Sequence, residues 1–254
     1  MSNFATYEYL RLVWDDVFKS PHRFGELMDW YDGVHDRSRR YHTADHVREC
    51  VSHLRLLRDD VLSDASRKNV NQDVALAALL FHDAFYRVEH VACEERSAQM
   101  YRQWASANTT WKEELRTSQA IKDVEDAILA TEREDVPRLV ESPTSRLVAD
   151  ADVLFLATND VGQLIEYEDK IRGEYEDYQA SGLTNWPSRS TPGEADERYE
   201  AARGNVLFRL LEAAKNHSLY LTPEVDARYT ARAASNLSFL LGVVGGRRVR
   251  RAAP

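Results

Sequence analysis

The sequence predicts an all-α protein, and three observations favour this fold class. Apolar residues recur at helical spacing through most of the chain. No segment shows the sustained two-residue alternation that a half-buried β-strand requires. Glycine is scarce, at 10 of 254 residues, so we expect few turns and long helices.

Segments with helical periodicity follow one another along the whole chain. In chain order they are 7–18, 24–35, 43–57, 74–86, 92–105, 118–130, 144–157, 161–178, 196–216 and 222–241. The last has a clear start, because Thr222 suits the N-cap, Pro223 the first helical position and Glu224 the first turn.

The length and composition are those of one globular domain. We place it at 1–244, with its core at about 31–241. The stretch 181–196, "SGLTNWPSRSTPGEAD", is rich in Ser, Gly, Thr and Pro and predicts a loop, either a mobile flap near a site or an insertion. The tail 245–254 is basic and lacks periodicity, which predicts disorder.

The charge and the cysteine content exclude several classes of protein. The net charge is -9, whereas a binder of long nucleic acid needs a broad basic surface. The two cysteines, Cys50 and Cys93, do not suggest a disulfide framework and fit a reducing cytoplasm. No apolar run approaches the roughly 20 residues that span a bilayer, and the first residues lack the apolar core of a signal peptide. We expect a cytoplasmic protein without a membrane or long nucleic-acid partner.

The most apolar run of the chain ends on two titratable residues. The stretch 75–87, "ALAALLFHDAFYR", predicts a helix that is apolar on nearly every side and ends with His82 and Asp83. A buried unpaired charge is costly, so buried charged residues normally have a partner or a metal. A second His-Asp pair, His35-Asp36, lies in a polar stretch and is expected on the surface.

Two further segments carry polar residues on apolar helix faces. In "RRYHTADHVREC", His42 and His46 are four residues apart and share one side of a helix, and His46 also shares a stripe with Cys50. In "RLVADADVLFLA", Asp152 interrupts an apolar stripe, whereas Asp150 points elsewhere.

His46, His82, Asp83 and Asp152 therefore form a candidate set of metal ligands from three helices. Two imidazole nitrogens and two carboxylate oxygens suit Mn, Fe, Co, Ni or Zn, and accommodate Mg together with waters. One dominant site of this kind leaves room for a water or a substrate. Taken singly, each residue also has a structural explanation, as a hydrogen-bonded core histidine, a neutral His-Asp pair or a capping carboxylate.

This order of residues resembles the HD superfamily of metal-dependent phosphohydrolases, and in particular its predicted phosphohydrolases of bacteria and fungi. The superfamily has an early His, an adjacent His-Asp and a late Asp, all on helices. The resemblance implies an HD-domain helical bundle. The motifs that carry it are "RYHTADHV" (40–47), "FHDAFY" (81–86), "EERSA" (94–98), "DADV" (150–153) and "IRGEY" (171–175).

The resemblance also implies roles for single residues. Tyr41-His42 followed by His46 is similar to a motif of cyclic-nucleotide phosphodiesterases, in which the first His is a general acid and the second a metal ligand. By this likeness His42 is the general acid, and His46, His82, Asp83 and Asp152 are the metal ligands. Glu94 matches a motif Glu that activates water or supports the ligands.

Two positions depart from the related sequences. These usually have Ala-Thr-x-x-His between the His-Asp pair and the late Asp. Here the stretch is "ATERED" (130–135), and Glu134 stands in place of the His. This change argues against a second metal and against the di-iron oxygenase branch. Cys93 stands where the related motif has Asn before Glu94.

The expected function is hydrolysis of a small phosphate ester, such as a nucleotide or a similar phosphorylated metabolite. Metal-activated water would attack phosphorus, His42 would protonate the leaving oxygen, and Arg172 or Lys122 would hold phosphate charge. Two alternatives stay open. One is a catalytically degenerate HD module that binds a metabolite or a protein partner, which Glu134 favours. The other is a helical protein with a purely structural metal.

Overall fold

The computed structural model describes residues 2–33, 39–88, 92–132, 140–180 and 192–252. Within these ranges the secondary structure is helical and no strand occurs, so the predicted all-α class is confirmed. A bilayer-crossing helix would need a long apolar stretch, and none of the helices in these ranges provides one.

All α-helices except the short α4 lie close to the segments that the sequence predicts. They are α1 Ser2–Phe18, α2 Phe24–Tyr31, α3 Ala44–Leu56, α4 Asp64–Arg67, α5 Gln72–Phe81, α6 Cys93–Ala107, α7 Ser118–Leu129, α8 Pro143–Val153, α9 Val161–Ala180, α10 Pro192–Lys215 and α11 Pro223–Ala252. Short helical turns at Leu57–Val61, after α3, and at Glu113–Leu115, before α7, lie largely outside the predicted segments, whereas the turn at Leu154–Ala157 forms the end of the predicted helix 144–157.

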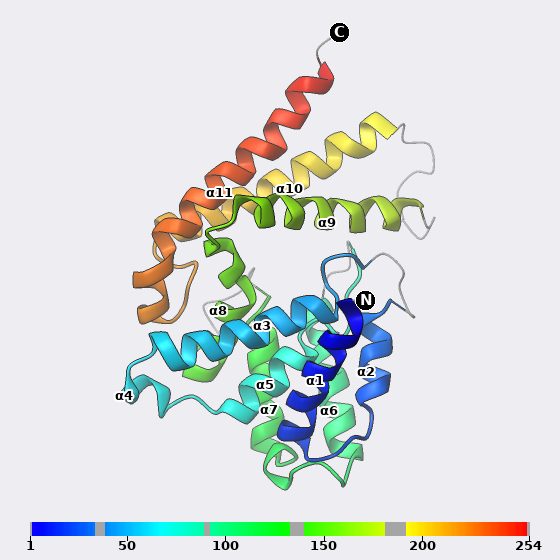
Figure 1. Cartoon of the computed structure of the whole chain (residues 1–254), viewed down its shortest axis with the longest axis vertical. Coiled ribbons are helices and arrows are strands. Elements are labelled where there is room, and N and C mark those ends of the chain that lie inside the picture. Colours follow the sequence, from blue (N-terminus) through cyan, green and yellow to red (C-terminus); the bar gives the residue numbers. More distant parts are fainter. Residues whose placement is uncertain (1, 34–38, 89–91, 133–139, 181–191, 253–254) are drawn as a thin grey trace.

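Helix α5 is the centre of the lower bundle. Every residue from 74 to 81 is buried, and α5 packs against α1, α3, α6, α7 and α8 (Figure 1). The unbroken apolar sequence explains this position, because a helix without a polar face must be covered on all sides. Its start is set by Asn71, whose side chain accepts the backbone N–H of Val74 at 3.2 Å.

The three long helices α9, α10 and α11 form an upper layer (Figure 1). A buried ion pair joins α9 to α10: the Glu168 carboxylate accepts a hydrogen bond from Arg203 Nε at 2.9 Å and another from the Tyr199 hydroxyl at 2.8 Å. Glu168 is fully buried, so loss of Arg203 would leave an uncompensated charge in the interior. This pairing fixes the position of α9, which faces the site described below.

The buried carboxylate of Asp150 connects α8 to the start of α11. It accepts the backbone N–H of Leu221 at 2.7 Å and that of Thr222 at 2.9 Å. Asp150 therefore anchors the backbone just before α11. Asp152, two residues further along α8, lies toward α3 instead.

Helix α5 ends earlier than predicted. The sequence predicts a helix over 74–86, but α5 ends at Phe81, and His82 and Asp83 lie in the following turn. The guanidinium of Arg39 donates to the backbone carbonyls of Asp83 at 2.7 Å and of Ala84 at 3.0 Å. The guanidinium of Arg39 thus satisfies these carbonyls in place of the N–H groups of a further helical turn.

The two segments expected to be irregular differ from that expectation where the structure describes them. The basic tail 245–254 predicts disorder, yet α11 continues through Ala252. Arginine is a good helix former, so the basic run extends the helix despite its lack of periodicity. Of the predicted loop 181–196, residues 181–191 lie outside the described residues and the remainder belongs to the start of α10.

Candidate metal centre

Three separate parts of the fold bring polar side chains to one buried point. His46 lies on α3, His82 and Asp83 lie in the turn after α5, and Asp152 lies in the last turn of α8. Because α5 packs against both α3 and α8, the apolar faces that carry these residues meet. The structure therefore brings together the four residues grouped from the sequence, and their binding of a metal stays a prediction.

The Nε2 atom of His46 is at the centre of this group. It lies 3.3 Å from His82 Nε2 and 3.2 Å from Asp152 Oδ1. It also lies 3.4 Å from Asp83 Oδ2. His82 Nε2 in turn lies 3.1 Å from Asp83 Oδ2 and 3.5 Å from Asp152 Oδ1. Two imidazole nitrogens and two carboxylate oxygens thus face one another within reach of a single cation.

The side chains in this group hold one another in charged forms. Burial alone would lower the pKa of His46, but the neighbouring Cys50 and Asp152 outweigh it and hold that pKa well above its usual value. The pKa of His82 is also raised, because Asp83 and Asp152 outweigh burial. The imidazoles lower the pKa of both carboxyl groups against the effect of burial. A bound divalent ion would take the place of the imidazole protons.

Backbone contacts orient the donor atoms. His82 Nδ1 donates to the carbonyl of Leu79 at 2.9 Å, which leaves Nε2 facing the group. Arg39 Nη1 donates to the carbonyl of Asp83 at 2.7 Å and to that of His42 at 3.1 Å. Arg39 therefore connects the turn that bears His82 to the segment that bears His42, a role that the sequence does not reveal.

One buried oxygen of the cluster lacks a hydrogen-bond donor. Asp83 Oδ2 accepts no hydrogen bond among the described residues, although two imidazole nitrogens lie within 3.4 Å of it. The charge of the protonated imidazoles compensates it, and a bound divalent ion would do so in place of their protons. The mixed nitrogen and oxygen donors are those of a divalent transition-metal site, so the residues present fit such an ion.

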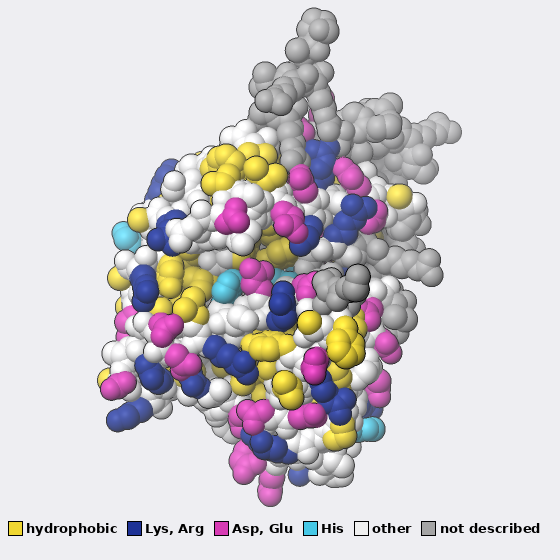
Figure 2. Space-filling view, in the orientation of Figure 1, with side chains coloured by type: hydrophobic (Ala, Val, Ile, Leu, Met, Phe, Trp, Pro, Cys, Tyr) yellow, Lys and Arg dark blue, Asp and Glu magenta, His cyan; other side chains and the backbone are white. Residues whose placement is uncertain are grey.

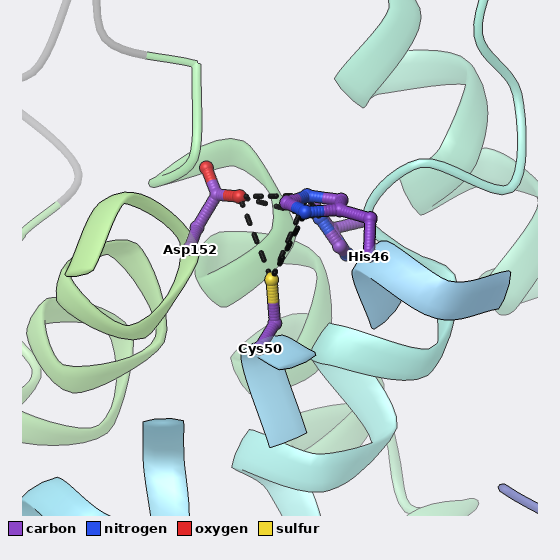
Figure 3. A group of neighbouring side chains, drawn as sticks. His46, Cys50 and Asp152 are labelled. Atoms are coloured by element: carbon purple, nitrogen blue, oxygen red, sulfur yellow. Dashed lines mark hydrogen bonds and ion pairs between the residues drawn. The ribbon is translucent and has the colours of Figure 1, made fainter. Parts of the chain in front are cut away.

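Cys50 belongs to this group, although the sequence does not single it out as a ligand. It lies one turn after His46 on α3, and its Sγ atom is 3.5 Å from His46 Nε2 and 3.8 Å from Asp152 Oδ1 (Figure 3). The donor atoms of His46, Cys50, His82 and Asp152 all lie within 4.8 Å of one another, so these four residues can hold a metal ion. The stripe shared by His46 and Cys50 is the signal in the sequence that points to this position.

A second imidazole lies beside the cluster and is held by a buried carboxylate. The ring centre of His42 is 5.9 Å from that of His46. His42 Nδ1 lies 2.8 Å from Glu174 Oε2, on α9. The other oxygen, Oε1, accepts the backbone N–H groups of Arg40, Tyr41 and His42 at 2.7–2.9 Å. Burial alone would raise the pKa of Glu174. The charge of His42 and these hydrogen bonds outweigh burial and lower that pKa to about 2. Glu174 thus fixes both the ring and its backbone.

Glu94, the predicted catalytic carboxylate, lies in the first turn of α6. Carboxylate oxygens of Glu94, Glu95 and Glu132 lie within 4.8 Å of one another. Burial raises the pKa of Glu94 to about 7, and the charges of Asp83 and Glu132 add to this effect. A carboxyl group with this pKa can exchange a proton near neutral pH. The role of Glu94 in catalysis stays a prediction. Glu134 lies outside the described residues.

The two predicted phosphate-binding residues lie in other surroundings. Arg172 contacts Glu176 at 2.9 Å within α9, and its guanidinium lies 5.8 Å from the ring centre of Tyr199 on α10. Lys122 is exposed on α7 and pairs with Asp126 one turn later. Neither lines the cavity that opens beside His46.

A cavity of about 680 Å³ opens beside His46. It is lined by residues of α1, α2, α3 and α9 and by the segment before α3. Its charged side chains are of both signs: Arg39, Arg40, Arg48 and Lys170, and Asp32, Asp45, Glu49 and Glu166. Figure 2 shows histidine and acidic side chains lying together near the middle of this face. The volume is typical of a pocket for a small molecule.

Comparisons of the chain with protein-family models, with curated proteins and with solved structures find no match. Function is therefore inferred from the chemistry of the site itself.

Proposed function

We propose that this protein is a metal-dependent phosphohydrolase of the HD type, which cleaves a small phosphate ester such as a nucleotide or a related metabolite. One observation carries the proposal. A buried cluster of metal-binding side chains lies next to a separate imidazole, His42, which Glu174 holds in a fixed orientation. A purely structural metal site needs no such neighbour.

The ion would be held by His46, His82, Asp83 and Asp152. When bound, the metal supplies Lewis acidity, which lowers the pKa of water and polarises a phosphoryl oxygen. The protein contributes the fixed arrangement of its ligands. The carbonyl of Leu79 keeps His82 Nε2 turned toward the cluster, and Arg39 holds the backbone of Asp83.

His42 is the proton donor to the leaving oxygen. Its Nδ1–H donates to Glu174, so Nε2 is the nitrogen from which the doubly protonated ring would give its proton. The carboxylate of Glu174 is itself anchored by three backbone N–H groups, which keeps the ring from turning. A positioned acid of this kind typically contributes about 10² to 10⁴ in rate.

The cavity beside His46 has the size for a small substrate. Arg48 and Lys170 line it, and a phosphate would compete for them with their partners Asp45 at 3.8 Å and Glu166 at 2.8 Å, whereas Lys122 is exposed on α7. The net charge of -9 disfavours long nucleic acid, whose phosphates would be repelled over a large surface. A short phosphate ester needs only the local cations.

The test combines a metal titration with a screen of substrates. We expect the purified full chain to bind close to one equivalent of a divalent transition metal and to hydrolyse at least one mononucleotide or sugar phosphate. The double variant His82→Ala/Asp83→Ala should lose both properties. The control His217→Ala, which removes an exposed histidine paired with Asp226, should keep both.

Three other outcomes would contradict the proposal. Metal and metabolite binding without turnover would favour the degenerate HD module. A full complement of metal in the double variant would show that the ligands are assigned wrongly. Cleavage of long DNA or RNA as fast as of mononucleotides would contradict the substrate class.

A further inference from the structure

The spacing of the donor atoms around His46 is that of ligands that share one ion, and it includes sulfur. In tetrahedral zinc, with Zn–N near 2.1 Å and Zn–S near 2.3 Å, two nitrogen ligands lie roughly 3.4 Å apart and a nitrogen and a sulfur roughly 3.6 Å apart. His46 Nε2 lies 3.3 Å from His82 Nε2 and 3.5 Å from Cys50 Sγ. Asp152 Oδ1 lies 3.2 Å from His46 Nε2 and 3.8 Å from Cys50 Sγ.

The position of Cys50 on α3 explains how the sulfur reaches the cluster. Residues four apart on a helix lie above one another on the same face, so the side chains of Cys50 and His46 project from the same face of α3. The Cys50 side chain is 1% exposed, and in Figure 3 its sulfur points between His46 and Asp152. A buried thiol that only fills the core would have apolar neighbours, whereas this one faces an imidazole and a carboxylate.

We propose that the sulfur of Cys50 is a metal ligand in this cluster and makes the site selective for thiophilic divalent ions such as Zn²⁺ over Mn²⁺ and Mg²⁺. The inference rests on the proposed function only in requiring that a metal occupies the cluster. On binding, the S–H bond breaks, its proton passes to solvent and a metal–sulfur bond forms. Thiolate is a soft ligand and favours zinc, whereas carboxylate and water suit manganese and magnesium.

The other cysteine provides a matched control. The chain has two cysteines, and Cys93 lies on α6 with its Sγ atom 3.6 Å from the carbonyl of Arg87. Both are buried, so Cys50→Ser and Cys93→Ser make the same chemical change in similar surroundings. Only the first removes a donor from the cluster.

Cobalt substitution tests the proposal without any measurement of turnover. The full chain is stripped of metal with a chelator and reloaded with Co²⁺. We expect one equivalent to bind and to give the intense near-ultraviolet charge-transfer band of a cobalt–thiolate bond. The band should persist in Cys93→Ser and disappear in Cys50→Ser. One equivalent of Co²⁺ bound to the unmodified chain without this band would overturn the proposal and leave the proposed function intact.

Metal selectivity gives a second readout. Loss of a supporting contact to a metal ligand typically costs 10- to 100-fold in affinity, so loss of the sulfur should weaken Zn²⁺ binding by at least about 100-fold. The affinity for Mn²⁺ should change by less than about tenfold, since manganese gains little from sulfur. An equal loss for both ions would mean that Cys50 supports the fold and does not bind the metal.

A measurement on the unmodified protein guards against a variant that fails to fold. X-ray absorption of the zinc-loaded chain should show a sulfur neighbour at about 2.3 Å in addition to nitrogen and oxygen at about 2.0–2.1 Å. A shell of nitrogen and oxygen alone would overturn the proposal. Failure of the chain to take up any metal would overturn both this proposal and the proposed function.

Discussion

His42 and His82 are oriented in the same way, since a protein oxygen engages the Nδ1 atom of each ring. For His82 the oxygen is the carbonyl of Leu79, and for His42 it is the carboxylate of Glu174. Nδ1 of each ring is therefore occupied, and Nε2 of His82 faces the cluster. The two partners differ in charge, which suits a ligand in one case and a proton donor in the other.

The role of His42 as an acid predicts a dependence on the leaving group. His42→Ala should keep its metal, because the ligand atoms of the cluster are untouched, but should lose about 10² to 10⁴ in rate on an alkyl phosphate. The loss on an aryl phosphate should be much smaller, since that group departs without a proton. Metal content and initial rates on both substrates measure this. Equal losses would show that His42 is not the acid, and loss of the metal would make it a ligand.

The depressed pKa of Glu174 predicts a dependence of stability on pH. Its folded pKa is about 2 and its ordinary value is 4.5, so the stabilisation is complete above about 4.5 and is lost as pH falls toward 2. The difference in unfolding free energy between the unmodified chain and Glu174→Gln should therefore shrink by roughly 2 kcal/mol between pH 5 and pH 3. Denaturant titrations of the metal-free proteins measure it.

A matched substitution separates this effect from general acid sensitivity. Glu212→Gln removes an exposed carboxylate on α10 that pairs with Lys215, and it should change stability little at either pH. A difference for Glu174→Gln that stays constant from pH 5 to pH 3 would contradict the assigned hydrogen bonds.

The candidate ligands could be predicted from the sequence because each interrupts an apolar stripe of its own segment. Glu174 could not, although the quoted motif "IRGEY" contains it, because its partners Arg40 to His42 lie more than 130 residues away. Only the packing of α9 over the start of α3 brings them together. Cys50 shares a stripe with His46, but a cysteine on an apolar face is equally compatible with simple packing.

Among the helices, α5 is the one on which the site most depends. It carries the turn with His82 and Asp83, and it separates α3 from α7 while contacting α8. Any movement of α5 would shift two donors relative to the other two. Its continuous apolar surface, which has no preferred exposed face, keeps it in place.

Removal of side-chain volume from α5 should destabilise the whole fold. Leu76 is 1% exposed, and Leu76→Ala should cost about 2–5 kcal/mol of unfolding free energy through lost contacts and a cavity. The same change at Leu12 on α1, which is 67% exposed, should cost less than about 0.5 kcal/mol. Urea denaturation of both variants tests this, and similar small costs would contradict the central position of α5.

Helix positions could be predicted more reliably than helix ends. The periodic segments fall on α-helices throughout the described residues, because burial of one face fixes the period. The end of α5 depends on Arg39, which lies more than 40 residues earlier and leaves no local signal. The π-helical turn at Leu57–Val61 and the short helix α4 both contact α11, through Arg228 at the carbonyl of Asp60 and through Glu224 at Ser66.

At the scale of the whole molecule, the cluster connects α3, the turn after α5, and α8, which are far apart in the sequence. A ligand that binds only the folded state stabilises it by mass action. With free Zn²⁺ at 100 times its dissociation constant, we expect the unfolding free energy to rise by about 2.7 kcal/mol. Thermal or urea denaturation with and without a chelator measures this. His82→Ala/Asp83→Ala should show no such rise, and a rise of the same size would place the metal elsewhere.

The wide separation of His46, His82 and Asp152 in the sequence also bears on the order of events in folding. Loops of tens of residues must close before these donors meet, so the cluster forms only when α3, α5 and α8 have already docked. An ion that binds so late stabilises the native state but not the transition state that precedes it. Such an ion should leave the folding rate almost unchanged and should slow unfolding, so its effect on the assembled bundle would be kinetic stabilisation.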